Sequence, residues 1–212
     1  MALMPSFRRR KQAASVIARL IAGFGELELT LAKCAGVALA HKRLPKLPAS
    51  GFNKYAHRIR YENFGIKLIF RLRGEKCRID ATSKLARKPF RQFGLESELD
   101  QALGAARACL QFRNLFAHCH WTQSKKRGLF FISLEDVARL PEPLNLSAFR
   151  YASVKNLTEA EDYFFHTMQL LEYVADEFAV RAELLRFHGS VKPKKRPQLN
   201  PDTKLFPHRN PH

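Results

Sequence analysis

Three side chains near the middle of the chain have the types and spacing that chemistry at a phosphate group requires. Arg113, Asn114 and His118 interrupt the otherwise apolar stretch between Cys109 and Trp121. An imidazole titrates near neutral pH and can accept or donate a proton. A guanidinium can stabilise the charge that gathers on a phosphate in the transition state. The amide can orient the imidazole or bind a phosphate oxygen, so the three groups are sufficient for metal-free RNA cleavage, in which the 2′-hydroxyl attacks the adjacent phosphate.

The spacing of these residues sets a geometric condition on that chemistry. Asn114 and His118 are four positions apart and share one face of a helix. Arg113 is five positions before His118, which places the two about 140° apart around a regular helix. We therefore expect a distorted helix end, or two copies of the helix, to bring Arg113 and His118 to one cleft.

Apolar residues at spacings of three and four predict the elements that position these side chains. The predicted fold class is all-α, an up-and-down bundle of four main helices with a long decorated connection and disordered basic termini. A capping box at Thr158–Glu161 predicts the start of the last helix. The four helices are expected over residues 13–42, 52–73, 96–120 and 159–188, with a loop and short helix over 74–94 and a short strand or extended segment over 129–133.

Composition divides the chain into one domain with two tails. Residues 1–12 carry a basic run and predict a disordered arm, and residues 189–212 are rich in Pro, Lys and Arg and predict a disordered tail. The bundle is expected over 13–188, because the 46% hydrophobic content of the chain suffices for one core.

The charge of the chain is strongly positive, with 37 Lys and Arg against 19 Asp and Glu and a formal net charge of +18. Such a field favours polyanions such as RNA, DNA, acidic partners or anionic membrane surfaces. The positive charge is concentrated over residues 42–91, which hold fifteen Lys and Arg against three acidic residues. A nucleic-acid groove and a solvated basic helix face are both consistent with that concentration. The candidate RNA-binding residues are Arg58, Arg60, Lys67, Arg71 and Arg73.

The segment from Arg113 to His118 resembles a family motif. Arg113-Asn114-Leu-Phe-Ala-His118 at the end of a predicted bundle helix is similar to the Arg-polar-x(3–4)-His motif of HEPN domains (higher eukaryotes and prokaryotes nucleotide-binding). The resemblance implies a helical bundle that often dimerises and places two motifs in one cleft. It implies metal-independent endoribonuclease activity, with Arg113 and His118 as the catalytic pair and Asn114 as the polar residue. Other members of the family are inactive and serve as binding or interaction modules.

The expected function is therefore a metal-independent endoribonuclease, of a toxin–antitoxin or defence system, and the alternative is a non-catalytic nucleotide- or RNA-binding or interaction module. The expected partners are RNA, a second copy of the chain, and an antitoxin or nucleotidyltransferase-type protein. We expect no cofactor, no metal and no membrane association, and a cytoplasmic location. Four widely spaced cysteines do not form a disulfide framework or paired CxxC metal ligands.

Structural interpretations of the same residues stay open at this stage. His118 can be a hydrogen-bonded structural residue, and Arg113 can pair with acids of the last helix. Trp121 can anchor the helix end or stack on a base. Cys109 with His118, Cys119 and His120 can be considered as a metal site, although adjacent ligands do not match the usual zinc spacings.

Overall fold

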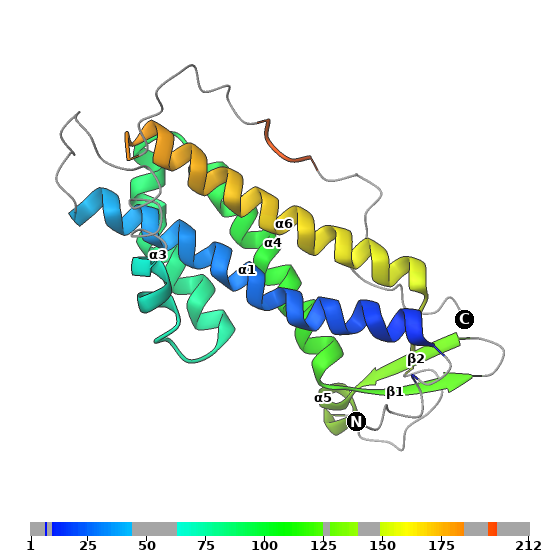
Figure 1. Ribbon diagram of the computed structural model, residues 1–212. Coiled ribbons are helices and arrows are strands. Elements are labelled where there is room, and N and C mark those ends of the chain that lie inside the picture. The colour runs from blue at the N-terminus through cyan, green and yellow to red at the C-terminus, as the bar shows by residue number, and fades with distance from the viewer. Residues whose placement is uncertain are drawn as a thin grey trace. The chain divides into compact units, whose positions relative to one another are not determined.

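The computed structural model describes residues 7, 10–43, 63–124, 128–139, 149–184 and 195–198. Most of these residues are helical, and the only sheet among them has three antiparallel strands in the order β1-β2-β3. This confirms the predicted helical fold class. The elements are α1 (Lys11–Arg43), a helical segment over residues 63–69, α3 (Glu75–Gln92), α4 (Glu96–Ala117), β1 (Cys119–Ser124), β2 (Gly128–Ser133), α5 (Leu134–Arg139), β3 (Arg150–Ala152) and α6 (Val154–Arg181) (Figure 1).

The chain forms two compact units, and α1, α4 and α6 each contribute to both. Among the described residues, we call 25–43, 63–107, 166–184 and 195–198 the helix unit, and 7, 10–24, 108–124, 128–139 and 149–165 the sheet unit. Within the described residues, no helix is long and apolar enough to cross a membrane.

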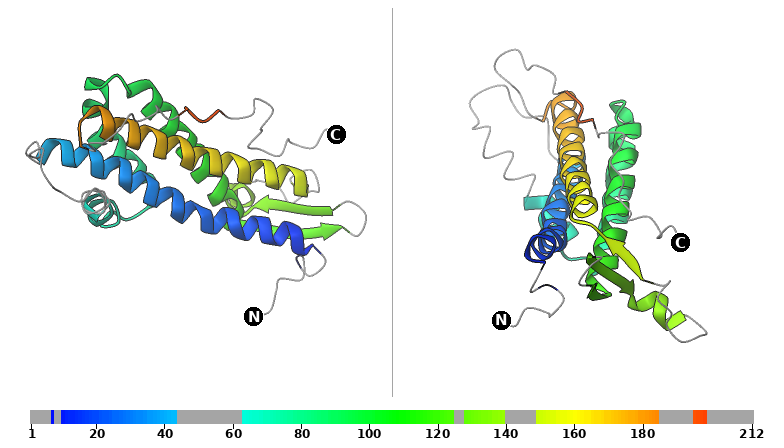
Figure 2. Two further views of the ribbon diagram at one scale, coloured as in Figure 1. Left: turned by 45° about the horizontal axis from the view of Figure 1, so that its top comes forward. Right: turned by 90° about the vertical axis from the view of Figure 1, so that its right-hand side faces the viewer.

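In the helix unit, α3 packs with the second half of α1, the first half of α4 and the second half of α6. The rings of Phe90 and Phe178 stack with their centroids 4.2 Å apart, and His41 contacts Phe178 edge-on. Lys33 Nζ lies 2.7 Å from the Asp176 carboxylate, which joins α1 to α6 (Figure 2). The core of this unit includes Leu27, Leu31, Ala35, Ile69, Ile79, Phe90, Leu99, Leu103, Leu171, Val174 and Phe178.

The helical segment 63–69 lies directly against the backbone of α1, and Gly65 makes this possible. A Cβ at Gly65 would lie 1.7 Å from the carbonyl oxygen of Ala32. Ile69, Ala32 and Ala35 are fully buried together in one cluster. The absence of a side chain at Gly65 therefore lets two backbones meet where any other residue would separate them.

In the sheet unit, an aromatic cluster joins the end of α4 to the sheet. The Trp121 ring centroid is 5.2 Å from that of Phe116, 5.1 Å from that of Phe131 and 5.7 Å from that of Phe7. Arg19 Nη2 donates to Glu161 Oε2 at 2.9 Å, which joins the first half of α1 to the first half of α6. The rest of the core includes Val16, Leu20, Phe24, Phe112, Leu157, Ala160 and Phe164.

Two predicted helix boundaries are wrong around residues 52–94. The predicted helix over 52–73 is helical only over 63–69 among the described residues, and residues 52–62 lie outside them. Residues 74–94, predicted as a loop with a short helix, form the long helix α3. Its buried face mixes the apolar Ile79 and Phe90 with Thr82, Ala86 and Pro89, and a proline inside a segment usually argues against a continuous helix.

The other main helices also differ at their ends from the prediction. The helix predicted over 96–120 ends at Ala117, because the chain enters β1 at Cys119. The helix predicted over 159–188 begins at Val154, four residues before the predicted capping box. Ser153 caps this helix instead, since its Oγ accepts a hydrogen bond from the Asn156 backbone N–H at 3.0 Å.

Candidate functional site

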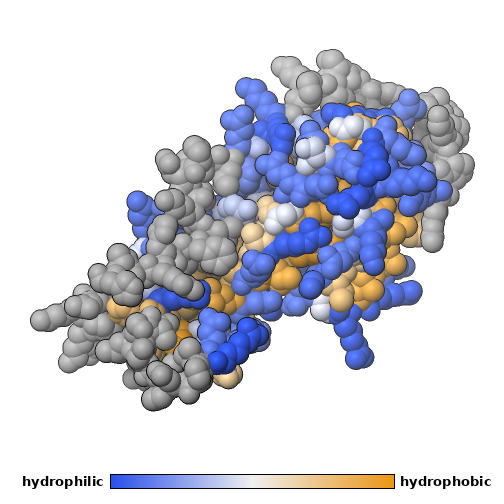
Figure 3. All heavy atoms as spheres, turned by 180° about the vertical axis from the view of Figure 1, so that it is seen from behind, coloured by the Kyte–Doolittle hydropathy of each residue, from blue (hydrophilic) through white to orange (hydrophobic). Residues whose placement is uncertain are grey.

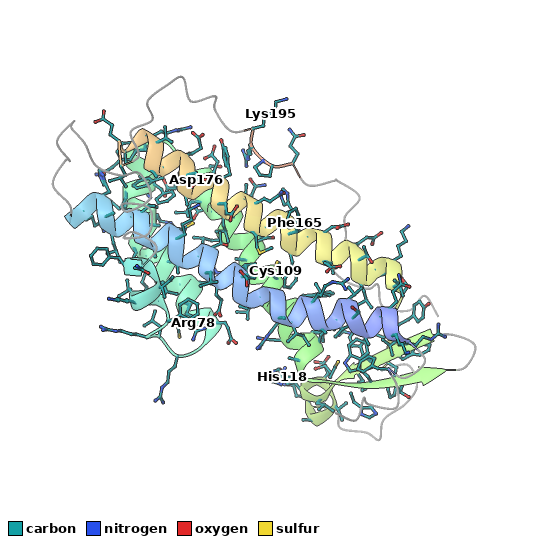
Figure 4. All side chains as sticks on the ribbon, in the orientation of Figure 1. Arg78, Cys109, His118, Phe165, Asp176 and Lys195 are labelled. Atoms are coloured by element: carbon teal, nitrogen blue, oxygen red, sulfur yellow. The ribbon has the colours of Figure 1, made fainter. Side chains whose placement is uncertain are left out.

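The end of α4 is fixed by burial on one side and by backbone hydrogen bonds on the other. Phe112 and Phe116 face the core of the sheet unit, and Ala117 and His118 are exposed. The His118 N–H donates to the Asn114 carbonyl at 3.0 Å, and the His118 carbonyl accepts from the Leu134 N–H at 3.1 Å. His118 is thus the turn residue between α4 and β1, tied to the start of α5 (Figure 4).

Arg113 and Asn114 interact directly on the last turns of α4. Arg113 Nη1 donates to Asn114 Oδ1 at 2.9 Å, and both side chains are half-buried. The Nε atom of Arg113 is enclosed beneath the surface. The amide oxygen of Asn114 therefore contacts the guanidinium, whereas the expected roles of the amide were to orient the imidazole of His118 or to bind a phosphate oxygen.

The expectation that a distorted helix end brings Arg113 and His118 to one cleft stays a prediction. His118 follows the last residue of α4, yet its N–H still makes the regular helical hydrogen bond to the Asn114 carbonyl. Its side chain is exposed, while the Arg113 side chain is half-buried. The imidazole is accessible to a large substrate from solvent.

The residues after His118 alternate between exposed and buried as those of a strand do, and this decides between the two interpretations of Trp121. His120 is exposed, and Trp121 is only 6% exposed within the aromatic cluster. Trp121 is therefore an anchor of the sheet unit and does not offer a ring face for base stacking. No group of three or more His, Cys, Asp or Glu side chains within the described ranges is placed to hold a metal ion.

Two further titratable groups near this end of α4 are neutral at physiological pH. Burial raises the pKa of the Cys119 thiol to about 12, and its Sγ donates to the Phe116 carbonyl at 3.4 Å. Burial also raises the pKa of Tyr163 on α6. Because a thiolate is the nucleophilic form of cysteine, Cys119 is not an activated nucleophile.

The candidate RNA-binding residues belong to the helix unit. Lys67, Arg71 and Arg73 are exposed, and in the described part of the chain their side chains make no ion pair or hydrogen bond. Arg58 and Arg60 lie outside the described residues.

Other cations of the segment 42–91 are engaged with carboxylates, which the sequence did not indicate. Arg78 Nη1 lies 2.7 Å from Glu28 Oε1, and Arg87 Nη2 lies 2.7 Å from Asp100 Oδ1. Arg91 pairs with Glu96, and its guanidinium lowers the pKa of that carboxyl. The available positive charge is therefore smaller than the count of basic residues suggests.

No family model, curated protein or solved structure matches this chain.

Proposed function

We propose that this protein is a HEPN-like, metal-independent endoribonuclease. The observation that carries the proposal is the end of α4, where Asn114 orients the Arg113 guanidinium and the exposed His118 follows the last helical residue. Within the described residues, no group of three or more His, Cys, Asp or Glu side chains is placed to hold a metal ion.

In the proposed reaction, His118 removes the proton from the 2′-hydroxyl of one nucleotide. The O2′–P bond forms, the P–O5′ bond breaks, and the products are a 2′,3′-cyclic phosphate and a 5′-hydroxyl end. Arg113 stabilises the negative charge on the five-coordinate phosphate. The 5′ oxygen takes its proton from water or from His118 of a second copy, which is the role we propose for a homodimer.

RNA binds to basic residues of the segment 42–91 in this proposal, and a partner protein controls the enzyme. The exposed cations Lys67, Arg71 and Arg73 contact RNA phosphates, together with Arg58 and Arg60. Metal-free RNA cleavage is harmful to the cell that makes the enzyme, so we propose a toxin–antitoxin or defence role. Its partner is an antitoxin or nucleotidyltransferase-type protein, and its location is the cytoplasm.

RNA cleavage in the presence of EDTA tests this proposal. Wild-type protein is expected to cleave a pool of diverse RNAs, and His118→Ala and Arg113→Ala are expected to lose cleavage. His120→Ala is the matched control, because His120 is also an exposed histidine two residues further on. Equal cleavage by all variants, or cleavage by none of the proteins including wild type, contradicts the proposal.

The second candidate function is a non-catalytic module that binds RNA or nucleotides. The position of Arg113 favours this second function. Its side chain is half-buried and already hydrogen-bonded within the protein, which suits a residue that supports the fold and takes no part in catalysis. This function predicts RNA binding that survives His118→Ala and falls steeply as salt rises, because phosphate contacts release counterions. Filter binding at two salt concentrations with intact RNA separates it from the nuclease.

A further inference from the structure

Large apolar side chains are exposed along the helical segment 63–69 and at the turn that follows. Figure 3 shows hydrophobic surface among hydrophilic side chains on the face that it draws. Phe64 is 40% exposed and Phe70 is 39% exposed, and Ile66 and Leu68 are each 36% exposed.

The arrangement around this segment is not that of a membrane-binding helix. Gly65 and Ile69 face α1, so Lys67 lies near the centre of the opposite, exposed side. Phe64 and Leu68 are four positions apart on one flank, and Ile66 and Phe70 are four positions apart on the other. An interfacial helix separates one apolar face from one charged face. Here a cation lies between two apolar flanks, and each apolar side chain is more than half covered.

The Phe70 ring is held in place by a network of the helix unit. Arg78 Cζ lies 4.9 Å from the centre of this ring. Arg78 is itself fixed by Glu28 Oε1 at 2.7 Å and by the Leu72 carbonyl at 3.1 Å. A ring that is already ordered loses little side-chain entropy when a flat ligand stacks on it.

The charge of the segment complements a polyanion. Residues 63–74 contain Lys67, Arg71 and Arg73 and no Asp or Glu. These three side chains are exposed and have no ion pair within the described residues. A surface that combines free cations with exposed aromatic rings matches single-stranded nucleic acid, whose phosphates need cations and whose unpaired bases stack on rings.

We propose that Phe64 and Phe70 stack on unpaired bases of single-stranded RNA, while Lys67 between them binds a phosphate. The inference rests on the RNA binding of the proposed function, and it does not depend on cleavage. The helix unit then carries a base-stacking surface. The bound RNA segment must be unpaired, since paired bases do not expose their faces.

Fluorescence anisotropy with the full chain carrying His118→Ala tests the proposal on RNA that stays intact. The probes are a twelve-nucleotide single-stranded RNA, the corresponding duplex, and an oligomer with the same backbone but no bases. Phe64→Leu and Phe70→Leu keep apolar bulk and remove the ring. Phe165→Leu is the matched control, because Phe165 is a 58% exposed phenylalanine elsewhere on the chain (Figure 4).

The expected result is a loss of affinity for single-stranded RNA of about five-fold or more in either variant of this surface. The control variant should bind as the parent does, and the base-free oligomer should bind all proteins equally, which also shows that the variants are folded. Equal affinity of parent and variants for single-stranded RNA overturns the inference. The inference is also overturned if the variants lose the same affinity for the base-free oligomer as for single-stranded RNA. It is overturned as well if the parent binds anionic lipid vesicles but not RNA and the two variants lose that vesicle binding.

These outcomes separate the inference from the proposed nuclease. Ring-dependent binding by a protein whose wild type does not cleave RNA refutes the nuclease and leaves the stacking surface in place. Cleavage by wild type with unchanged binding by Phe64→Leu and Phe70→Leu refutes only the stacking surface.

Discussion

Arg78 shows how a cation of the basic segment becomes part of the fold. Its guanidinium contacts the Glu28 carboxylate, the Leu72 carbonyl and the face of Phe70. Glu28 is only 7% exposed, so its charge requires a partner. Fifty positions separate the two residues, and a pair so distant in sequence cannot be recognised from local spacing.

We expect Arg78→Gln to lower the free energy of unfolding by about 2–3 kcal/mol, because it leaves the Glu28 carboxylate nearly buried without its counter-charge. Arg107→Gln is the matched control, since Arg107 pairs with Asp80 at 3.2 Å in an exposed position. Its effect should be below about 1 kcal/mol. Urea unfolding measures both, and equal losses would show that the Arg78 contacts do not stabilise the fold.

At the candidate site, the Arg113 guanidinium can donate to Asn114 with one nitrogen and still offer its other donors to a phosphate. Arg113→Lys keeps the positive charge but removes the planar fork of donors. We expect the initial rate of RNA cleavage in EDTA to fall by about 100-fold or more. A thermal melt of the same protein checks that the fold persists. A lysine variant as active as wild type would mean that Arg113 supplies charge alone.

The contact between the segment 63–69 and α1 depends on one glycine. Gly65→Ala places a Cβ against the Ala32 carbonyl oxygen, so the two backbones must separate. We expect a loss of about 1–3 kcal/mol in the free energy of unfolding, which is the usual cost of overpacking a core.

Gly104→Ala is the opposite case within the helix unit. Gly104 is exposed inside α4, and a Cβ there meets nothing within 4 Å. It should gain about 0.5–1 kcal/mol in the free energy of unfolding from better helix propensity. Chemical denaturation of both variants tests the pair, and a stabilised Gly65→Ala protein would disprove the close approach.

The start of α6 separates a capping motif in the sequence from the cap in the structure. Ser153→Ala removes the acceptor of the Asn156 N–H and should cost about 1 kcal/mol. Thr158→Ala should change stability by less than about 0.5 kcal/mol, because Thr158 is an exposed residue inside the helix. A larger loss of stability in thermal unfolding for Thr158→Ala than for Ser153→Ala would show that the predicted capping box, and not Ser153, caps α6.

Long helices with strong apolar periodicity could be predicted from the sequence, and the exceptions have physical causes. The prediction for residues 13–42 matches α1 (Lys11–Arg43) closely, since its buried side chains recur at spacings of three and four. α3 was not predicted at full length, because its buried stripe has few large apolar residues and Pro89 lies inside it, where proline usually ends a helix. α4 was predicted three residues too long, because the alternation of exposed His120 and buried Trp121 is too short to reveal a strand.

The candidate site was predicted in part. The sequence placed Arg113, Asn114 and His118 at a helix end, and the structure places the end of α4 between the last two. The hydrogen bond between Arg113 and Asn114 could not be predicted, because neighbouring side chains on a helix point about 100° apart and meet only through particular rotamers.

For the whole molecule, the net charge of +18 describes a total but not its distribution. Arg78, Arg87, Arg91 and Arg107 each face a carboxylate, and this distribution depends on the tertiary fold. The cations left without such a partner in the described residues include Lys67, Arg71 and Arg73. The positive charge that remains unpaired therefore depends on the fold and not on composition alone.

Attack of the 2′-hydroxyl on the adjacent phosphate leaves a chemical signature at the ends of the cleaved RNA, so end-group analysis of the products is the sharpest test of the proposed nuclease. Two RNAs of identical sequence are incubated with wild-type protein in EDTA, one with free 2′-hydroxyls and one fully 2′-O-methylated. We predict cleavage of the first RNA alone, with 2′,3′-cyclic phosphate and 5′-hydroxyl ends that are absent with His118→Ala. Cleavage of both RNAs, cleavage of neither, or 5′-phosphate ends would contradict it.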